Sequence, residues 1–209
     1  IGDLTLAAGK LYGMTSTGGV NDFGVMFEWD PFTNTYTKKF DFDGANKGRA
    51  PFGSLTLFGG KLYGMTAAGG ANDNGIIFEW NPLTNTCIKK FDFDTVNAGG
   101  IYPMGDLISF GGKFYGMTSN GGVNAVGVIF EWDLSTNTYV NKIDFDDSNK
   151  GSYPFGSLTV CEGKIYGMTN MGGDNGLGVI FEWDTAGNSF AKKTDFNFAN
   201  GGYPYYTRL

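Results

Sequence analysis

An internal repeat that occurs four times constrains the fold of this 209-residue chain more than any other feature. The tetrapeptide Tyr-Gly-Met-Thr begins at Tyr12, Tyr63, Tyr115 and Tyr166, and the tripeptide Phe-Glu-Trp begins at Phe27, Phe78, Phe130 and Phe181. A fixed period of this length is the signature of an architecture in which each copy forms one supersecondary unit. We therefore expect a single domain over residues 1–209, made of repeats 1–52, 53–104, 105–155 and 156–209.

Each copy contains four strand-sized runs that are separated by turn residues. In the second copy we expect strands at residues 54–58, 61–66, 75–80 and 86–93, which we name a to d in chain order. Gly59-Gly60 predicts a two-residue hairpin between a and b, and Asn81–Asn85 predicts a turn between c and d. Tight hairpins make neighbouring strands antiparallel. The sequence thus predicts an all-β fold, a β-propeller built from four repeats of about 51 residues, each a four-stranded antiparallel blade.

Composition and charge exclude several classes of function. The chain has no apolar run of the roughly 18 residues that a membrane helix needs, so we expect no membrane span. A formal charge of −6 without a basic cluster argues against nucleic acid as a partner, because phosphates must be neutralised by Lys and Arg. Histidine, the commonest general base and metal ligand, is absent. The sequence does not open on a signal peptide, so we expect a mature chain or a fragment of a longer one.

The prolines between the copies leave the number of blades open. Pro51, Pro103 and Pro154 precede the second to fourth copies, and Pro204 follows the fourth as though it filled the place before the first. A closed four-bladed ring explains this pattern. A piece of a longer repeat array, or a homo-oligomer of partial rings, explains it as well.

The conserved spacing within a copy resembles a known family. The run Leu11–Thr15, followed by Gly18-Gly19, Asn21, Gly24 and Phe27, resembles the bacterial tandem repeat often called the GloVer repeat, and the pattern recurs in all four copies. That family is similar in strand pattern to kelch blades. The resemblance implies a secreted or cell-surface bacterial protein, and it brings no established catalytic residue.

The long loops form the candidate binding surface, which we call the loop face. In an antiparallel blade the b–c and d–a loops lie at one end, and the tight a–b and c–d turns lie at the other. Long loops on a rigid scaffold usually carry function. The candidate binding residues are therefore the polar side chains of these loops: Asn21, Asn72, Asn124, Asn175, Asp43, Asp94, Asp146, Asn46, Asn97, Asn149 and Asn200.

The acidic residues of the d–a loops have two interpretations. The spacing of Asp41, Asp43 and Asn46 offers several oxygen ligands within six residues, which is compatible with Ca²⁺. The alternative is that these side chains accept hydrogen bonds from backbone N–H groups and cap the turns. We favour capping, and therefore predict no metal site and no cofactor.

The repeated strand residues are interpreted as structural. Phe27 and Trp29 face the same side of a strand, which fits packing between blades, although a sugar-stacking platform is an alternative. The glycine of Tyr-Gly-Met-Thr is expected to let neighbouring backbones approach closely. Glu28 has an equivalent in every blade, so no pair is singled out for opposed pKa values in acid–base catalysis.

Two lysine pairs and both cysteines are also assigned structural roles. Lys38-Lys39 and Lys89-Lys90 are expected to be solvated on outer strands, where they discourage edge pairing. Cys87 and Cys161 replace aromatic residues of other copies, so they are expected to be small buried hydrophobes without a disulfide.

Near-identical blades predict a non-catalytic binding or adhesion module that recognises a glycan or a surface protein through the loop face, and the family resemblance implies that this module is extracellular. A structural repeat unit of a surface stalk, filament or oligomer is the alternative. A propeller glycan hydrolase or lyase is a third hypothesis, but no copy gains a unique acid, base or nucleophile.

Overall fold

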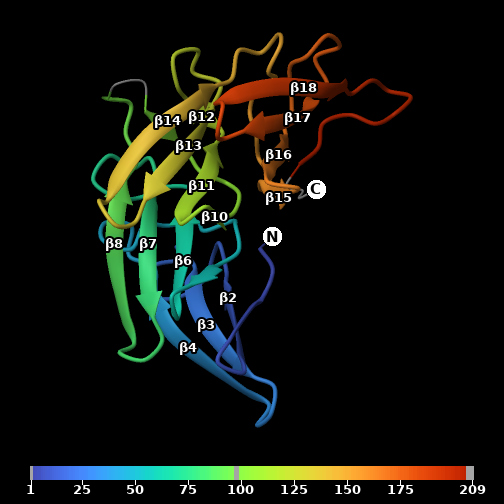
Figure 1. Cartoon of the computed structure of the whole chain (residues 1–209). Helices are drawn as coiled ribbons and strands as arrows, with labels where there is room; N and C mark the ends of the chain where they lie inside the picture. The colour runs from blue at the N-terminus through green and yellow to red at the C-terminus, as the bar shows by residue number, and fades with distance from the viewer. Residues whose placement is uncertain (1, 97–98, 206–209) are drawn as a thin grey trace. The chain divides into compact units, whose positions relative to one another are not determined.

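The computed structural model describes residues 2–96 and 99–205, and these contain many strands and no α-helix. Four of its sheets are four-stranded and antiparallel, one for each repeat (Figure 1). No helix in the described residues is long and apolar enough to cross a membrane. The predicted all-β fold of four-stranded antiparallel blades is confirmed, whereas closure into a four-bladed ring stays a prediction.

The strands follow one plan in every repeat. The first repeat contains β1 (Thr5–Ala7), β2 (Lys10–Met14), β3 (Val25–Asp30) and β4 (Thr35–Asp41). The second contains β5 (Thr56–Phe58), β6 (Lys61–Thr66), β7 (Ile76–Asn81) and β8 (Thr86–Asp92). The third contains β10 (Ile108–Phe110), β11 (Lys113–Thr118), β13 (Val128–Asp133) and β14 (Thr138–Asp144). The fourth contains β15 (Thr159–Cys161), β16 (Lys164–Met168), β17 (Val179–Asp184) and β18 (Ser189–Asp195).

Each sheet keeps its strands in chain order, and a short extra pair lies in the loops. Strands β9 (Gly100–Ile101) and β12 (Asn120–Gly121) pair antiparallel outside the four large sheets. In the second repeat the predicted strand ends differ from the observed ones by two residues at most, because the turn residues that delimit them act locally.

A β-bulge interrupts the pairing of strands c and d at the same place in every repeat. In the first repeat Met26 pairs with Phe40 and Phe27 with Lys38, so Lys39 is the extra residue on β4. A bulge changes the direction of the side chains next to it. Here Lys39 reaches Glu28 while Phe40 packs on the hydrophobic core.

The chain forms two compact units, Ile1–Asp94 and Thr95–Leu209, and each holds two repeats with a core between them. In the first unit the ring of Phe42 lies 5.7 Å from that of Phe78 in a T-shaped contact. In the second, Phe145 lies 5.6 Å from Phe181. The prediction of one domain over residues 1–209 stays a prediction.

The aromatic residues of the third strands pack in these cores. Trp80, Trp132 and Trp183 are fully buried, whereas Trp29 is half-buried. The interpretation of the tryptophans as packing residues is confirmed for the three buried ones, because a buried indole offers no surface to a sugar.

The glycine of each second strand makes room for an aromatic ring, which corrects the expectation of close backbones. Gly64 pairs with Phe78 across β6 and β7. A Cβ atom on Gly64 would lie 2.7 Å from Phe78 Cζ, and its nearest neighbours are all side-chain atoms. Side-chain packing therefore requires glycine at this position.

Both cysteines are free thiols, but their surroundings differ. Cys87 packs against the core of the first unit, and burial raises the pKa of its thiol to about 12. Cys161 is exposed, so the prediction that it is buried is wrong. It ends the edge strand β15, where even the equivalent Phe58 and Phe110 are only half-buried.

Candidate functional site

The structure brings the b–c and d–a loops of each repeat together through one repeated carboxylate. The aspartate that ends each fourth strand accepts a hydrogen bond from a backbone N–H of the b–c loop. The donors lie 2.7–2.8 Å away, in the pairs Val20–Asp41, Ala71–Asp92, Val123–Asp144 and Asp174–Asp195. The b–c loop and the end of the fourth strand therefore lie together in every repeat.

The four predicted asparagines of the b–c loops are used for the same purpose. Each Nδ2 group donates to the backbone carbonyl that follows the fourth strand. The distances are 2.9 Å for Asn21 to Phe42, 3.4 Å for Asn72 to Phe93, 2.7 Å for Asn124 to Phe145 and 2.9 Å for Asn175 to Phe196. These amides position the loops, and a direct role in ligand binding stays a prediction.

The aspartates of the d–a loops cap a turn. Asp43 Oδ1 accepts the N–H groups of Asn46 and Lys47, both at 2.8 Å. Asp146 does the same for Asn149 and Lys150 at 2.8 and 2.7 Å. Burial alone would raise the pKa of the Asp43 carboxyl, but the two N–H donors outweigh it and hold that pKa below its usual value. The capping interpretation is confirmed at these two loops.

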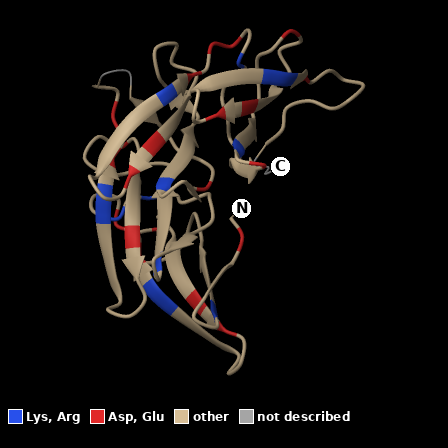
Figure 2. Ribbon diagram, viewed as in Figure 1, with Lys and Arg blue, Asp and Glu red and all other residues tan. Residues whose placement is uncertain are grey.

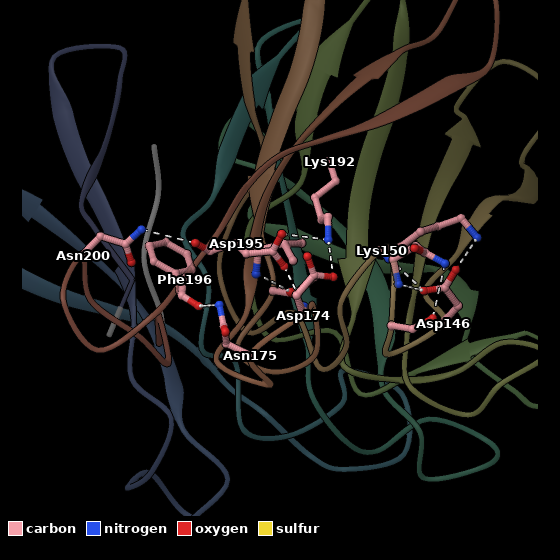
Figure 3. A network of polar contacts seen from close by, with 12 residues as sticks. Asp146, Lys150, Asp174, Asn175, Lys192, Asp195, Phe196 and Asn200 are labelled. Carbon is pink, nitrogen blue, oxygen red and sulfur yellow. Dashed lines mark hydrogen bonds and ion pairs between the residues drawn. The ribbon is translucent and has the colours of Figure 1, made fainter.

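The corresponding residues of the other two repeats differ. In the fourth repeat Asn197 takes the place of the capping aspartate, and its Oδ1 accepts the N–H groups of Ala199 and Asn200. Asn200 also donates to the Asp195 carbonyl at 3.2 Å, as Figure 3 shows. In the second repeat Asp94 occupies the position, and Asn97 lies outside the described residues.

Within each unit, the d–a loop of one repeat is joined to the b–c loop of the next. Arg49 and Ala68 exchange two backbone hydrogen bonds at 2.8 and 3.2 Å, and Ser152 and Met171 do so at 2.8 and 3.1 Å. Arg49 adds a two-pronged contact to Asp73, with nitrogen–oxygen distances of 3.2 and 2.8 Å. Backbone hydrogen bonds thus connect the loops of the two repeats within each unit.

The residue before each inter-repeat proline adopts an uncommon backbone conformation. Ala50, Tyr102, Tyr153 and Tyr203 have φ between 51° and 59°, a region that bulky residues rarely occupy. Hydrogen bonds stabilise it, since the N–H groups of Ala50, Tyr153 and Tyr203 each donate to a b–c loop carbonyl. Sequence reasoning missed these residues, although the recurrent Tyr-Pro dipeptide was a signal.

The residue at the tip of the b–c loop differs between repeats, whereas the hydrogen bonds that hold the loop are the same. The residue whose N–H binds the strand-ending aspartate is Val20, Ala71, Val123 or Asp174, and each is exposed. Val20 and Val123 have exposed fractions of 80% and 74%. Asp174 forms an ion pair with Lys192 at 2.9 Å (Figure 3). A constant frame therefore presents different side chains.

The described residues contain no group of three or more His, Cys, Asp or Glu side chains that could hold a metal ion. Asp43 Oδ1 and Asp146 Oδ1 each accept two backbone N–H groups instead.

A second repeated network, which the sequence did not reveal, surrounds the glutamate of each third strand. Glu79 is bonded to Lys61 at 2.6 Å and to the Tyr63 hydroxyl at 3.0 Å, and Lys90 lies 3.9 Å away. The same network surrounds Glu28, Glu131 and Glu182. Figure 2 shows acidic segments on the third strands with basic segments on neighbouring strands. The constant spacing of Lys, Tyr and Glu in the repeat was the available signal.

These contacts keep every one of the four glutamates charged. Burial would raise the pKa of the Glu79 carboxyl, but hydrogen bonds from Lys61 and Tyr63 lower it. Hydrogen bonds from Lys164 and Tyr166 lower the pKa of Glu182 to about 2. The outer-strand lysines were expected to be solvated, but Lys39 and its equivalent Lys193 bind these carboxylates at 3.3 Å.

Comparison with known structures shows what the fold is similar to. TolB from Acinetobacter baumannii aligns with a TM-score of 0.58 and 14% identity over 91% of this chain and 42% of that chain. An extracellular domain from B. thetaiotaomicron aligns with a TM-score of 0.63 and 10% identity, over 97% of this chain and 23% of that chain. A chain of the nidogen/laminin complex aligns with a TM-score of 0.60 and 14% identity, over 93% of this chain and 62% of that chain. The chain spans less than two thirds of each, and the likeness concerns the propeller-like fold.

At the level of sequence, the model of the Gloeobacter/Verrucomicrobia repeat matches residues 1–160 and 97–209. No curated protein sequence matches the chain.

Proposed function

Because the chain belongs to the Gloeobacter/Verrucomicrobia repeat family, we propose that it is a non-catalytic module that binds a protein surface through its loop face. The observation that carries the proposal is the contrast between a constant loop frame and variable exposed tips. The frame consists of the asparagine and aspartate hydrogen bonds that recur in every repeat. Loops that are ordered before binding lose less conformational entropy when a partner is bound.

The chemistry of the tips favours a protein over a glycan as the partner. Val20 and Val123 are largely exposed apolar side chains, and Val96, in the d–a loop after β8, is 65% exposed. Apolar side chains that are covered on binding supply the hydrophobic part of a protein interface. Glycan recognition, the other ligand class expected for this face, becomes an outcome of the test below.

The glutamate networks support a role without catalysis. A general acid at neutral pH needs a raised carboxyl pKa. The pKa values of Glu28, Glu79, Glu131 and Glu182 are all lowered, and each carboxylate is bonded to lysine and tyrosine. The four sites are equivalent, so none has the distinct environment that a catalytic centre requires.

We place the module outside the cell, at the bacterial surface or in the secreted fraction. One similar structure is an extracellular domain and another is a complex of nidogen with laminin. These names suggest that comparable folds serve in extracellular protein recognition. Labelling of intact cells by an antibody against the chain tests the location, and labelling only after lysis would refute it.

The binding proposal is tested with a phage-displayed library of bacterial surface-protein fragments and a glycan array. We expect selected protein fragments to bind the wild-type chain, and the Val123→Ser, Asp174→Ser double variant to bind them at least about tenfold more weakly. The matched control carries Phe32→Ser and Leu83→Ser at the turn end of the first unit, where both side chains are over 90% exposed. Its affinity should not change.

Three results would contradict the proposal. One is binding that the turn-end control abolishes and the tip variant leaves intact. Another is binding to glycans with no protein fragment selected. The third is turnover of a polysaccharide by the wild-type chain. Unchanged thermal unfolding of both variants shows that any loss of binding is local.

A further inference from the structure

The b–c loop of the fourth repeat carries an Asn-Gly pair next to its tip, and we propose that Asn175 is a site of spontaneous deamidation and isoaspartate formation. Gly176 follows Asn175 in the chain. The equivalent asparagines of the other three repeats are followed by residues with a β-carbon: Asp22, Asp73 and Ala125. Cyclisation of the backbone onto an asparagine side chain is fastest before glycine, because no β-carbon crowds the attacking nitrogen. The modification belongs to this one loop and does not depend on what the loop face binds.

The reaction needs water and neither an oxidant nor a reductant. After hydroxide has removed its proton, the Gly176 nitrogen attacks Asn175 Cγ and forms a new carbon–nitrogen bond. The Cγ–Nδ2 bond then breaks, and the amide group takes a proton from water and leaves as ammonia, which gives a cyclic succinimide. Water opens this ring at either of its carbonyl groups. Opening at Cγ gives aspartate, and opening at the backbone carbonyl carbon gives isoaspartate, in which the main chain runs through the former side chain.

Few contacts restrain the two groups that react. The Nδ2 group of Asn175 donates one hydrogen bond, to the Phe196 carbonyl at 2.9 Å (Figure 3). The Gly176 N–H donates to the Gly173 carbonyl at 3.2 Å, at the long end of the usual range. A Cβ atom on Gly176 would meet no atom within 4 Å, so this part of the loop has room to change its backbone angles. Opening these two hydrogen bonds lets the nitrogen approach Cγ.

Two other Asn-Gly pairs are held in ordered backbone. Gly75, which follows Asn74, is buried, and its N–H donates to the Gly69 carbonyl at 3.0 Å. The pair formed by Asn120 and Gly121 is the strand β12 itself, whose residues pair with those of β9. Attack at either pair requires a paired or buried segment to unfold locally, which slows the reaction.

The Asn-Gly pair at Asn200 is held through its side chain. Asn200 Oδ1 accepts the Asn197 N–H at 2.7 Å, and Asn200 Nδ2 donates to the Asp195 carbonyl at 3.2 Å. The following Gly201 forms a backbone bridge with Asn197. Both ends of this amide are therefore fixed, whereas Asn175 is fixed through its nitrogen alone among the described residues. We expect Asn175 to react first of the four.

Either product removes the bond that holds the loop. In aspartate, a carboxylate oxygen replaces Nδ2 beside the Phe196 carbonyl oxygen, so two acceptors face each other and no hydrogen bond forms. In isoaspartate, an extra methylene group enters the main chain next to Asp174, whose N–H binds Asp195 at 2.7 Å. The b–c loop of the fourth repeat is thus released. Because Asp174 is a binding tip, we also expect weaker binding of the partner, and this consequence rests on the function proposed above.

Peptide mapping by mass spectrometry tests the assignment after incubation of the chain at mildly alkaline pH. Succinimide, aspartate and isoaspartate should accumulate at Asn175 at least about fivefold faster than at Asn74, Asn120 or Asn200. An equal or faster rate at any of these three would overturn the proposal.

Two matched variants exchange the residue that follows the asparagine. Gly176→Ala gives the fourth repeat the residue of the third, and Ala125 already adopts a φ of 60°, close to the 71° of Gly176. This variant should slow modification of Asn175 at least about tenfold. Ala125→Gly places glycine after Asn124 and should make that asparagine deamidate within about threefold of the rate of Asn175. A Gly176→Ala chain modified as fast as the wild type, or an Asn124 that stays intact beside the new glycine, would refute the reasoning.

Amide exchange measures the release of the loop. Exchange in residues 172–178 should become faster in the incubated wild type and in Asn175→Asp, but not in incubated Gly176→Ala. Unchanged exchange in Asn175→Asp would refute the release. Incubated wild type should also bind its selected protein fragments more weakly than incubated Gly176→Ala, and equal binding would refute that consequence. A chain that selects no fragment contradicts the proposed function, while the mapping and exchange results still decide whether Asn175 is modified and the loop released.

Discussion

Replacing Gly64 with alanine tests whether the glycine of each second strand is there to accommodate the ring opposite it. The added Cβ would lie 2.7 Å from Phe78 Cζ, 2.9 Å from Phe78 Cε1 and 3.0 Å from Leu55 Cδ2. Non-bonded carbon atoms prefer separations of about 3.5–4.0 Å, so all three contacts are too short by roughly 0.5–1 Å. Ring and methyl group would both have to move.

The surrounding core decides how much this costs. Phe78 is fully buried and packs against Phe42, so its ring has no open space to enter. Adding a methyl group to a well-packed core costs about 1–3 kcal/mol. Replacing glycine within a strand returns about 0.5–1 kcal/mol, because the unfolded chain loses conformational freedom. We therefore expect Gly64→Ala to lower the free energy of unfolding by about 1–2 kcal/mol.

Urea unfolding measures the effect as a lower midpoint with an unchanged slope. Phe78→Leu removes the ring atoms that collide with the new Cβ, so the double variant should lose less stability than the sum of the two single variants. Gly187→Ala is the control, because its nearest neighbour would be Ser189 Oγ at 3.9 Å. A Gly64→Ala variant as stable as the wild type, or strictly additive effects, would refute the reasoning.

Three further predictions concern the repeated polar networks. The pKa of Glu182 is lowered to about 2, from about 4.3 in an unfolded chain. Its ionised carboxylate therefore stabilises the folded state fully above about pH 4.3, and this contribution is lost as the pH falls toward 2. Glu182→Gln should flatten the acid limb of stability against pH in urea unfolding, and an unchanged limb would contradict this. Burial and the Glu28 carboxylate raise the pKa of Tyr12 to about 12, so the stabilisation by its neutral phenol is complete below about pH 10 and is lost as the pH rises toward 12. Tyr12→Phe should remove one late-ionising group from the tyrosinate absorbance titration, whereas loss of a group titrating near 10 would speak against the network. Asn124→Ala removes a 2.7 Å hydrogen bond to the Phe145 carbonyl, and should cost about 1 kcal/mol and speed amide exchange in residues 121–127. Asn149→Ala, whose amide bonds only Ser148 Oγ at 3.4 Å, should leave that exchange unchanged.

Much of the fold could be predicted because its signals are local. The strand Lys61–Thr66 has the predicted bounds, and the hairpins lie where glycine pairs or Asn-rich turns occur. Two-residue glycine turns and alternating apolar residues define strands without reference to the rest of the chain. Because the four copies share one pattern, a strand assignment that is correct for one copy holds for all four.

The sequence predicted which loops carry the candidate site residues, but not the contacts that these residues make. The asparagines of the b–c loops do lie on the loop face, but their amide groups bind carbonyls 21 residues further along the chain. No local pattern marks such a partner. The same holds for Lys39, whose contact with Glu28 depends on a bulge in the pairing of β3 with β4.

The sequence by itself determined the repeat, the strand class and the end of each blade that carries the long loops, because strand periodicity and turn chemistry act over a few residues. Only the tertiary structure decided what each repeated residue contacts. Gly64 faces a ring, Cys161 is exposed, and the glutamates are neutralised by lysines from two neighbouring strands. It also showed that Leu55, Phe78 and Trp80 of the second repeat are buried in the core that this repeat shares with the first. The physical reason is that burial depends on the neighbour of a repeat, which its own sequence does not contain.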